Sequence, residues 1–504
     1  MVALTGDAGA HDLGGGYRLS APRFVGQAEG RLSAVRTGSS RGPEGATPSF
    51  DEALAACEIT QVFEVQMTGE QRPRGDAPPM ATRAASGDDA FVFETPDLGD
   101  QVGQVVLAID ENGALTWNFP EPDDAVDGSS TARGAGGPTK RFLIRESTPV
   151  TAPTDAGTQR GLLGTIGQRV LKVLVYPLTD SLGEISESYV AKWETAKRPY
   201  TVRTFTPANY GSRVGQTLTA DEWDALRGNR TLLFVHGTAS STHTAFASLP
   251  ETTVAALNAL YDGRVIAFDH HTLSSTPEQN VFEFVRLMPP DLTLDVDIVS
   301  HSRGGLVART MAGELGAPPP INVGRSIFVA TPNDGTVLAD PDHMVAFLDR
   351  FTTMLNLLPP GPASAVAEVL EAIVTVVKVV GRGLLGGLSG LASMNPTGDF
   401  IAKLNAPDDA SATNYALAAN YEPAGASLVD LVATTIGNAV LDRVFGDRHN
   451  DLIVPTEGVH TIGGDPTFSI PDERRFVFDD AGVGHTNFFG HPTTSEKLLA
   501  WVGG

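Results

Sequence analysis

The sequence predicts an α/β protein with a mostly parallel sheet flanked by helices, preceded by a β-rich N-terminal domain. From about residue 200 onward, short apolar segments alternate with stretches of helical periodicity, and each apolar segment ends in polar residues or glycine. This alternation is typical of the strand and helix units that build a parallel sheet. The length of 504 residues exceeds the size at which one hydrophobic core keeps growing, so we expect more than one domain.

The composition is that of an ordinary globular protein, with 41% hydrophobic and 19% charged residues. The 36 Lys and Arg residues against 60 Asp and Glu give a net charge of −24, which repels phosphate backbones and argues against a nucleic acid partner. The single cysteine, Cys57, excludes an intramolecular disulfide and makes a cysteine-based metal site implausible. The acidic residues lack EF-hand spacing, and we predict no metal and no cofactor.

Four regions are predicted along the chain. Residues 1–55 are rich in Gly, Ser, Ala and Pro and are predicted to be flexible. Residues 56–150 contain strand-like segments separated by turn residues, which predict a β-rich accessory domain whose protein partner is unknown. Residues 151–200 are interpreted as a linker and a helical connection, with helical patterns over 169–178 and 185–197. Residues 201–504 are predicted to form the α/β domain.

The N-terminus lacks the basic start and apolar middle of a secretory signal. No stretch reaches the roughly 18 uninterrupted apolar residues that a membrane span requires. We therefore expect a cytoplasmic protein without a transmembrane segment.

Six apolar segments are the strand candidates of the α/β domain: TLLFVHG, RVIAFDHH, DVDIVSHS, RSIFVATPNDG, NYALAANYE and RRFVFDDAG. In an open α/β sheet, the carboxyl ends of the strands meet at one crevice. The polar residues that follow these strands are therefore expected to converge there.

One of these segments leads into a serine. In VDIVSHSRGGLVART, Ser302 follows a strand candidate and precedes a helix candidate, and 300–304 is a Gly-x-Ser-x-Gly pattern with serine in the first place. The pattern is typical of a sharp turn that projects a nucleophile outward. Ser302 is therefore the candidate nucleophile, and the backbone amide of Arg303 is a candidate donor to an oxyanion.

A second oxyanion donor is expected in the loop that follows the strand candidate TLLFV. The Thr238 amide is the predicted donor and the Ala239 amide is the alternative, because the sequence does not decide which one points inward. His236 and Gly237 are predicted to shape this binding loop. His301, beside the serine, is interpreted as a packing residue at the end of a strand.

These segments resemble the α/β-hydrolases, specifically the bacterial lipase and esterase branch with its relatives that deacylate lipid anchors. The resemblance rests on His236-Gly237, on residues 301–309 around the serine and on TPNDGTVLAD at 331–340, and it covers roughly 201–504. It implies the α/β-hydrolase fold and a serine, acid, histidine order along the chain.

The order implied by the resemblance assigns the acid and the base. Asp451 in HNDLIVP matches the acid segment of the family, with Asp447 and Asp430 as alternatives. His485, in a glycine-rich loop after the last strand candidate, is the implied base. In this interpretation His485 accepts the proton of Ser302, while Asp451 fixes the tautomer of the imidazole.

The implied function is a serine hydrolase that cleaves carboxylic esters of small-molecule or lipid-like substrates through an acyl-enzyme. An acyltransferase or amidase that uses the same three residues stays open, as does a catalytically silent fold that serves as a binding or effector module. The long apolar segment 340–395 is interpreted as a helical cap over the serine, with ordinary covering helices as the alternative.

Overall fold

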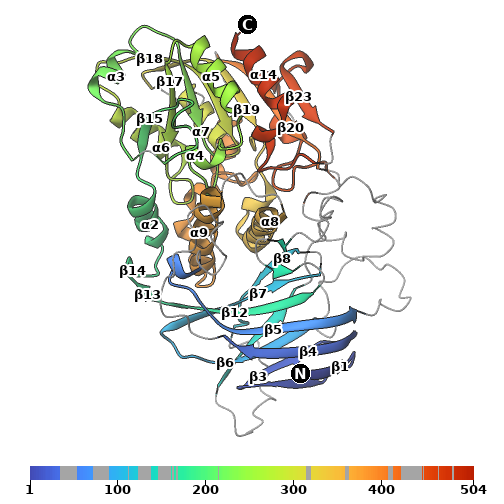
Figure 1. Cartoon of the computed structure of the whole chain (residues 1–504). Coiled ribbons are helices and arrows are strands. Elements are labelled where there is room, and N and C mark those ends of the chain that lie inside the picture. The colour runs from blue at the N-terminus through green and yellow to red at the C-terminus, as the bar shows by residue number, and fades with distance from the viewer. Residues whose placement is uncertain are drawn as a thin grey trace.

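The computed structural model shows a β-rich part and an α/β part, with helices α8 (Met344–Leu357) and α9 (Ala363–Val380) between them (Figure 1). The structure describes residues 1–33, 54–71, 90–111, 113–122, 138–145, 160–161, 164–165, 168–213, 215–313, 319–357, 363–406, 412–421, 445, 448–463, 465–479 and 482–503.

The α/β part is built on a seven-stranded sheet. Its order is β15 (Thr201–Thr204), β17 (Val265–Asp269), β16 (Thr231–Val235), β18 (Leu294–His301), β19 (Ile321–Val329), β20 (Thr413–Ala419) and β23 (Arg475–Phe478). The β15–β17 pair is antiparallel, and every other neighbouring pair is parallel. All six strand candidates lie in this sheet, so the predicted mostly parallel sheet is confirmed.

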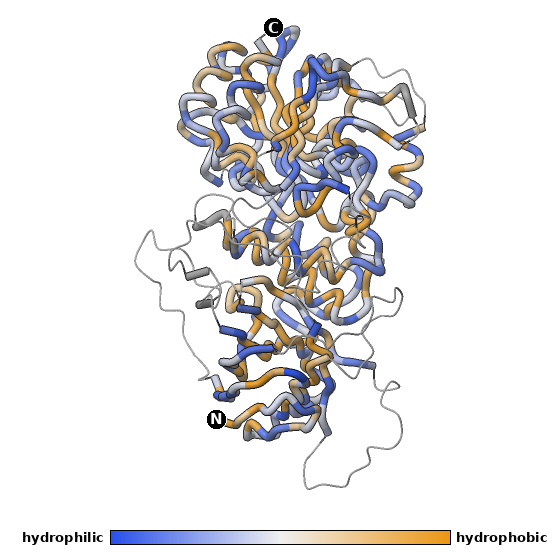
Figure 2. The backbone as a smooth tube through the Cα atoms, turned by 90° about the vertical axis from the view of Figure 1, so that its right-hand side faces the viewer, coloured by the Kyte–Doolittle hydropathy of each residue, from blue (hydrophilic) through white to orange (hydrophobic). Residues whose placement is uncertain are grey.

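Helices cover both faces of this sheet. In β16, Leu232 and Phe234 point into a core shared with α5 (Glu251–Leu260) and α14 (Pro492–Gly503), while Leu233 and Val235 point into a second core. This second core is shared with α6 (Pro277–Leu287) and α7 (Gly304–Met311). Because both faces are covered, the strands read as continuous apolar runs, which appear orange in the middle of the upper part in Figure 2.

The β-rich part is a sandwich of two antiparallel sheets. The larger has the order β1 (Val2–Thr5), β4 (Phe24–Leu32), β5 (Thr60–Gln71), β12 (Arg169–Pro177), β7 (Val102–Ile109) and β8 (Leu115–Asn118). The smaller has the order β2 (Ala10–Gly14), β3 (Tyr17–Ser20), β6 (Phe91–Pro96) and β9 (Thr139–Ile144). Residues such as Phe63, Phe93 and Phe142 fill the space between the two sheets.

The outer face of the larger sheet packs against α8 and α9. In β7, Val105 and Leu107 face the two helices, while Val106 between them faces the smaller sheet. The core on the helix side continues without a break into the core of the α/β sheet. Helices α8 and α9 therefore lie in one continuous core between the six-stranded sheet of the β-rich part and the seven-stranded sheet of the α/β part (Figure 1).

The predicted flexibility of residues 1–55 is wrong for its first part, because β1 to β4 lie within residues 2–32; residues 34–53 lie outside the described ones. The apolar alternation in this segment is short and is interrupted by glycines at positive φ, such as Gly14 at 87° and Gly16 at 85°. Only a few side chains carry the packing, among them Tyr17, Leu19 and Phe24.

The predicted helix over 169–178 is also wrong, because these residues form the central strand β12. Its apolar side chains pack on both faces, with Leu171 and Val173 on one and Val170 and Leu174 on the other. Because both faces are buried, apolar residues stand next to one another in the sequence instead of alternating with polar ones, and Lys172 separates two such groups. This spacing of apolar residues mimics a helix.

The remaining connection is partly helical: α2 (Tyr189–Lys197) lies in the segment where a helical pattern was seen. It follows a small hairpin of β13 (Thr179–Asp180) and β14 (Gly183–Glu184). The shorter elements are α3 (Ala220–Asp224), α4 (Thr242–Ala245), α10 (Ser389–Ala392), α11 (Asp399–Leu404), β10 (Arg160–Gly161), β11 (Gly164–Thr165), β21 (Thr461–Ile462) and β22 (Asp465–Ser469). Among the described residues, no helix combines the length and apolarity needed to cross a membrane.

Candidate active site

Ser302 lies in the turn between β18 and α7, with φ at 52°. A residue with a side chain rarely adopts this left-handed conformation, which costs on the order of 1 kcal/mol or more. The Ser302 N–H donates to the Val329 carbonyl at 2.8 Å and the side chain is buried. A Cβ on Gly304 would lie 2.4 Å from the Val235 carbonyl oxygen, so only glycine allows the turn to pass this close to β16.

His485 joins Ser302 to Asp451. Its Nε2 lies 2.9 Å from the Ser302 Oγ, and its Nδ1 lies 2.8 Å from the Asp451 Oδ2. An ionised carboxylate only accepts hydrogen bonds, so Nδ1 carries the proton and Nε2 is free to accept one from the hydroxyl. The structure thus brings together three side chains that are far apart in the sequence.

The loop that carries Asp451 fixes its carboxylate. The Asp451 Oδ1 accepts hydrogen bonds from the backbone N–H groups of Ile453, at 3.1 Å, and Val454, at 2.8 Å. The His485 N–H also donates to the Asp451 carbonyl at 3.0 Å. Asp451 and His485 are each 1% exposed, so the pair is shielded from water. The alternative acids, Asp430 and Asp447, lie outside the described residues.

His301 forms a hydrogen bond with the backbone of the same histidine. Its Nε2 lies 2.9 Å from the His485 carbonyl oxygen, and because a carbonyl only accepts, Nε2 is the donor. Burial lowers the pKa of His301 to about 3, so the ring stays neutral. The interpretation of His301 as a packing residue therefore missed a hydrogen bond to the backbone of His485.

The loop after β16 passes directly over Ser302. A Cβ on Gly237 would lie 2.6 Å from the Ser302 Cβ, so glycine is required at this position. His236 lies behind the loop: its Nε2 accepts from the His270 N–H at 3.1 Å, and its Nδ1 donates to the Gly237 carbonyl at 3.0 Å. Burial lowers the pKa of His236 to about 4, which keeps the ring neutral. His236 therefore shapes the loop without touching the serine.

The two candidate oxyanion donors of this loop differ in their hydrogen bonding. The Ala239 N–H donates to the Thr272 Oγ1 at 3.1 Å. Within the described part of the chain, the backbone N–H groups of Thr238 and Arg303 have no hydrogen-bond acceptor. The Arg303 side chain points away from the serine, and its Nε donates to the Gly390 carbonyl at 2.7 Å.

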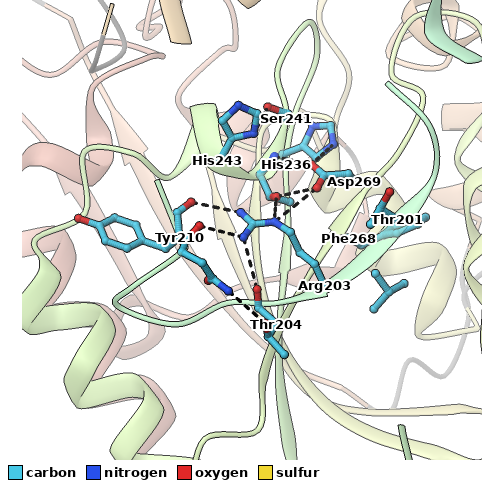
Figure 3. Close-up of polar contacts among 12 residues, drawn as sticks. Thr201, Arg203, Thr204, Tyr210, His236, Ser241, His243, Phe268 and Asp269 are labelled. Carbon is cyan, nitrogen blue, oxygen red and sulfur yellow. Dashed lines mark hydrogen bonds and ion pairs between the residues drawn. The ribbon is translucent and has the colours of Figure 1, made fainter. Parts of the chain in front are cut away.

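A buried arginine anchors the far end of this loop (Figure 3). The Arg203 Nε donates to the Thr242 Oγ1 at 2.9 Å, and its other nitrogens donate to the carbonyls of Thr204, Asn209 and Tyr210. Asp269 accepts from the Thr242 N–H at 2.7 Å and from the Thr242 Oγ1 at 3.0 Å. The start of α4 is thereby fixed to the ends of β15 and β17.

A second anchor reaches this loop from α9. The Glu368 Oε1 lies 3.1 Å from the His243 Nε2, and the Ser241 Oγ donates to the Glu368 Oε2 at 3.1 Å. Burial alone would raise the pKa of Glu368, but the hydrogen bond from His243 and the charges of His243, Arg198 and Arg213 lower it to about 2. Glu368 is therefore ionised and connects α9 to the loop beside Ser302.

A small cavity of about 30 Å³ lies at Ser302 and His485. It is closed by apolar side chains of three helices: Ala245 of α4, Phe351 and Leu355 of α8, and Val369 of α9. Thr238 lines it from the loop after β16. The predicted segment 340–395 thus contributes two helices to the wall above the serine.

The described residues contain no group of three or more His, Cys, Asp or Glu side chains placed to hold a metal ion. Cys57 is buried, its Sγ lies 3.8 Å from the Glu371 carbonyl, and burial raises the pKa of its thiol to about 12.

Sequence reasoning missed Arg203, Asp269 and Glu368. The signal for Arg203 was a charged residue inside the apolar segment TVRTF, because a charge buried in a strand requires partners. Glu368 carried no comparable signal, since an acid in an apolar helix also fits a solvated helix face.

The family model described as a domain of unknown function, DUF7379, matches residues 197–503, which is more than half of the chain. The chain belongs to this family. The DUF7379 region begins at the end of α2 and includes the seven-stranded sheet, α8 and α9. A comparison with curated proteins finds no match.

Solved structures similar to the chain include a Bacillus licheniformis lipase, BlEst2, with 16% identity over 60% of this chain and 97% of that chain, at a TM-score of 0.33. The phospholipase PlaB from Legionella pneumophila has 15% identity over 54% of this chain and 60% of that chain, at a TM-score of 0.34. Lipase 1 from Pelosinus fermentans has 12% identity over 54% and 97% of the two chains, at a TM-score of 0.34. Sequence identities and TM-scores this low carry no information on the reaction of this DUF7379 protein.

Proposed function

We propose that the protein is a serine hydrolase that cleaves carboxylic esters. The observation that carries the proposal is the continuous hydrogen-bonded path from the Ser302 Oγ through His485 to Asp451, at 2.9 and 2.8 Å. A serine hydroxyl is a weak nucleophile unless an adjacent base accepts its proton. The arrangement provides that base and an acid that holds it in the required tautomer.

In the proposed reaction, the Ser302 Oγ attacks the acyl carbon as its proton passes to the His485 Nε2. The bond between the acyl carbon and the alkoxy oxygen then breaks, and the leaving alcohol takes the proton from His485. Water attacks the acyl-enzyme, gives its proton to His485 and releases the carboxylic acid, and the proton returns to Ser302. Asp451 stays ionised and stabilises the imidazolium that forms in each half-reaction.

Two backbone amides support the stabilisation of the oxyanion. The N–H groups of Thr238 and Arg303 flank Ser302 and have no acceptor among the described residues, whereas the Ala239 N–H is already bonded to Thr272. This difference favours Thr238 over Ala239 as the second donor. Each such donor contributes on the order of 3 kcal/mol to transition-state stabilisation in comparable sites.

A fluorophosphonate probe tests the proposal, because it forms a covalent bond with an activated serine. We expect labelling of the wild-type protein and none of Ser302→Ala, together with hydrolysis of p-nitrophenyl esters by the wild type alone. Folded wild-type protein that is neither labelled nor active would favour the catalytically silent binding module instead. Acyl transfer is separated from hydrolysis by product analysis in the presence of added alcohols or amines, since only the acceptor differs.

A further inference from the structure

We propose that α8 and α9 form a fixed wall of the acyl site, that Phe351 and Leu355 determine its size, and that the substrate is an ester of a short acyl group such as acetyl. This inference rests on the proposed function and narrows its substrate class. It follows from the size of the cavity at Ser302 and from the way in which both helices are held.

The cavity is too small for a long acyl chain. Its volume is about 30 Å³, whereas pockets that hold drug-sized ligands measure roughly 300 to 1,000 Å³. Phe351 and Leu355 of α8 line the cavity, so their side chains limit its size on that side.

The outer side of α8 is hydrogen-bonded to an edge strand. β8 pairs with β7 on one side, and on its other side polar side chains of α8 bond to its backbone. The Thr353 Oγ1 accepts from the Leu115 N–H at 2.9 Å, and the Asp349 Oδ1 accepts from the Trp117 N–H at 2.7 Å. Helix α8 therefore takes the place of a neighbouring strand.

Three further contacts connect α8 to β8 and its neighbouring segments. The Trp117 Nε1 donates to the Thr352 Oγ1 at 2.9 Å, the Asn356 Nδ2 donates to the Gly113 carbonyl at 2.8 Å, and Arg145 pairs with Asp349 at 2.8 Å. The four polar side chains of α8 that make these contacts, Asp349, Thr352, Thr353 and Asn356, are each at most 8% exposed. Moving α8 away from β8 would leave these buried groups and the strand backbone without partners.

Helix α9 is held at two points along its length. Near its start, Glu368 bonds to His243 and Ser241 at 3.1 Å each. Near its end, the Lys378 Nζ lies 2.9 Å from the Asp180 Oδ2, with both side chains at most 3% exposed. Both helices are therefore fixed to parts of the chain outside the segment 340–395. Such contacts are expected of a fixed wall, whereas a freely opening lid would lack them.

The test compares kcat/KM for p-nitrophenyl acetate and octanoate in the full chain. We expect the wild type to prefer the acetate by about tenfold or more, because a pocket discriminates by roughly tenfold or more per misfitting methylene. Phe351→Ala and Leu355→Ala remove side chains from the wall and should raise the octanoate-to-acetate ratio by at least about tenfold. Met354→Ala is the matched control, since Met354 is equally buried on α8 but does not line the cavity.

The outcomes separate this inference from the proposed function. Ser302-dependent turnover that favours the octanoate in the wild type would overturn the inference alone, as would unchanged ratios in both folded wall variants. The absence of any Ser302-dependent labelling or turnover would overturn the proposed function, and the inference with it. If Phe351→Ala does not fold, Phe351→Leu and Leu355→Ala provide the same comparison.

Discussion

At the scale of single residues, the geometry around Ser302 depends on close approaches that larger side chains would prevent. The loop after β16 crosses the serine at Gly237, where an added Cβ would meet the Ser302 Cβ at 2.6 Å and the His301 carbonyl oxygen at 2.9 Å. Contacts below about 3 Å force either the loop or the serine to move. The active geometry is therefore sensitive to a single methyl group.

Gly237→Ala is expected to lower kcat/KM for ester hydrolysis by about 100-fold, because a displacement of about 1 Å in a catalytic group has effects of this size. The control is Gly211→Ala, where an added Cβ has no atom within 4 Å. Steady-state kinetics on a p-nitrophenyl ester measures the effect, and circular dichroism checks the fold. Wild-type activity in Gly237→Ala would contradict the close approach of Gly237 to Ser302.

His301 is expected to position the catalytic histidine through its bond to the His485 carbonyl. In His301→Phe the ring still packs on Phe489, but the carbonyl loses its donor, and we expect kcat to fall by about tenfold or more with KM unchanged. His301→Gln keeps an N–H donor and should recover part of the loss. Equal kcat values for His301→Phe and His301→Gln, or a change in KM alone, would reduce His301 to a packing role.

The residues that the sequence could locate are those whose neighbours repeat a known pattern. Ser302, Asp451 and His485 each lie in a recognisable segment, and they are in hydrogen-bond contact in the structure. The hydrogen bonds of His301 to His485 and of Glu368 to His243 were not predicted, because these partners are 184 and 125 positions away in the chain. Such contacts depend on tertiary packing and have no local signature.

At the scale of elements, the sequence was enough to predict strands of the parallel sheet, whereas several strands of the sandwich could not be predicted from it. The six apolar runs of the α/β part end in polar residues or glycine, and those of β16, β17, β18 and β19 are largely buried on both faces, which is a strong signal. β12 is also buried on both faces, but its apolar residues are adjacent in the sequence and interrupted by Lys172, which gives a helical spacing. β1 to β4 have too few apolar residues to stand out from their glycines.

The junction of α8 and β8 is expected to make stability depend on pH through Asp349. Burial raises the pKa of this carboxyl from 3.8 to about 6, although Arg145 and the Trp117 N–H lower it in part. The folded chain thus holds the proton more tightly than the unfolded chain does. The contribution of protonated Asp349 to the free energy of unfolding is therefore complete below pH 3.8 and is lost as the pH rises through 6.

Asp349→Asn removes this titration while keeping an acceptor for the Trp117 N–H. We therefore expect the melting temperature of the wild type, relative to Asp349→Asn, to decrease between pH 4 and pH 7. Scanning calorimetry of both proteins at four pH values measures the difference. A constant difference would mean that Asp349 does not change its ionisation in this range.

At the scale of the whole molecule, the continuous core connects the β-rich part to the α/β part through α8 and α9. Phe351 and Leu355 of α8 and Val369 of α9 belong to this core and also line the cavity at Ser302. A polar cluster is buried at the same junction, where Lys378 of α9 bonds to Asp180 at 2.9 Å and to Tyr189 at 3.2 Å. Unfolding of either the β-rich part or the α/β part should therefore expose apolar core residues of the other part to water.

Lys378→Met tests this coupling, because it leaves Asp180 buried without its cation. Removal of one partner of a buried ion pair costs roughly 3 to 5 kcal/mol, whereas removal of both partners is often close to neutral. We expect Lys378→Met to lower the melting temperature and the double variant Asp180→Leu with Lys378→Met to restore most of it. Because the core is continuous, calorimetry should show one transition that shifts as a whole. Two transitions, of which only one moves, would show that the β-rich and α/β parts unfold independently.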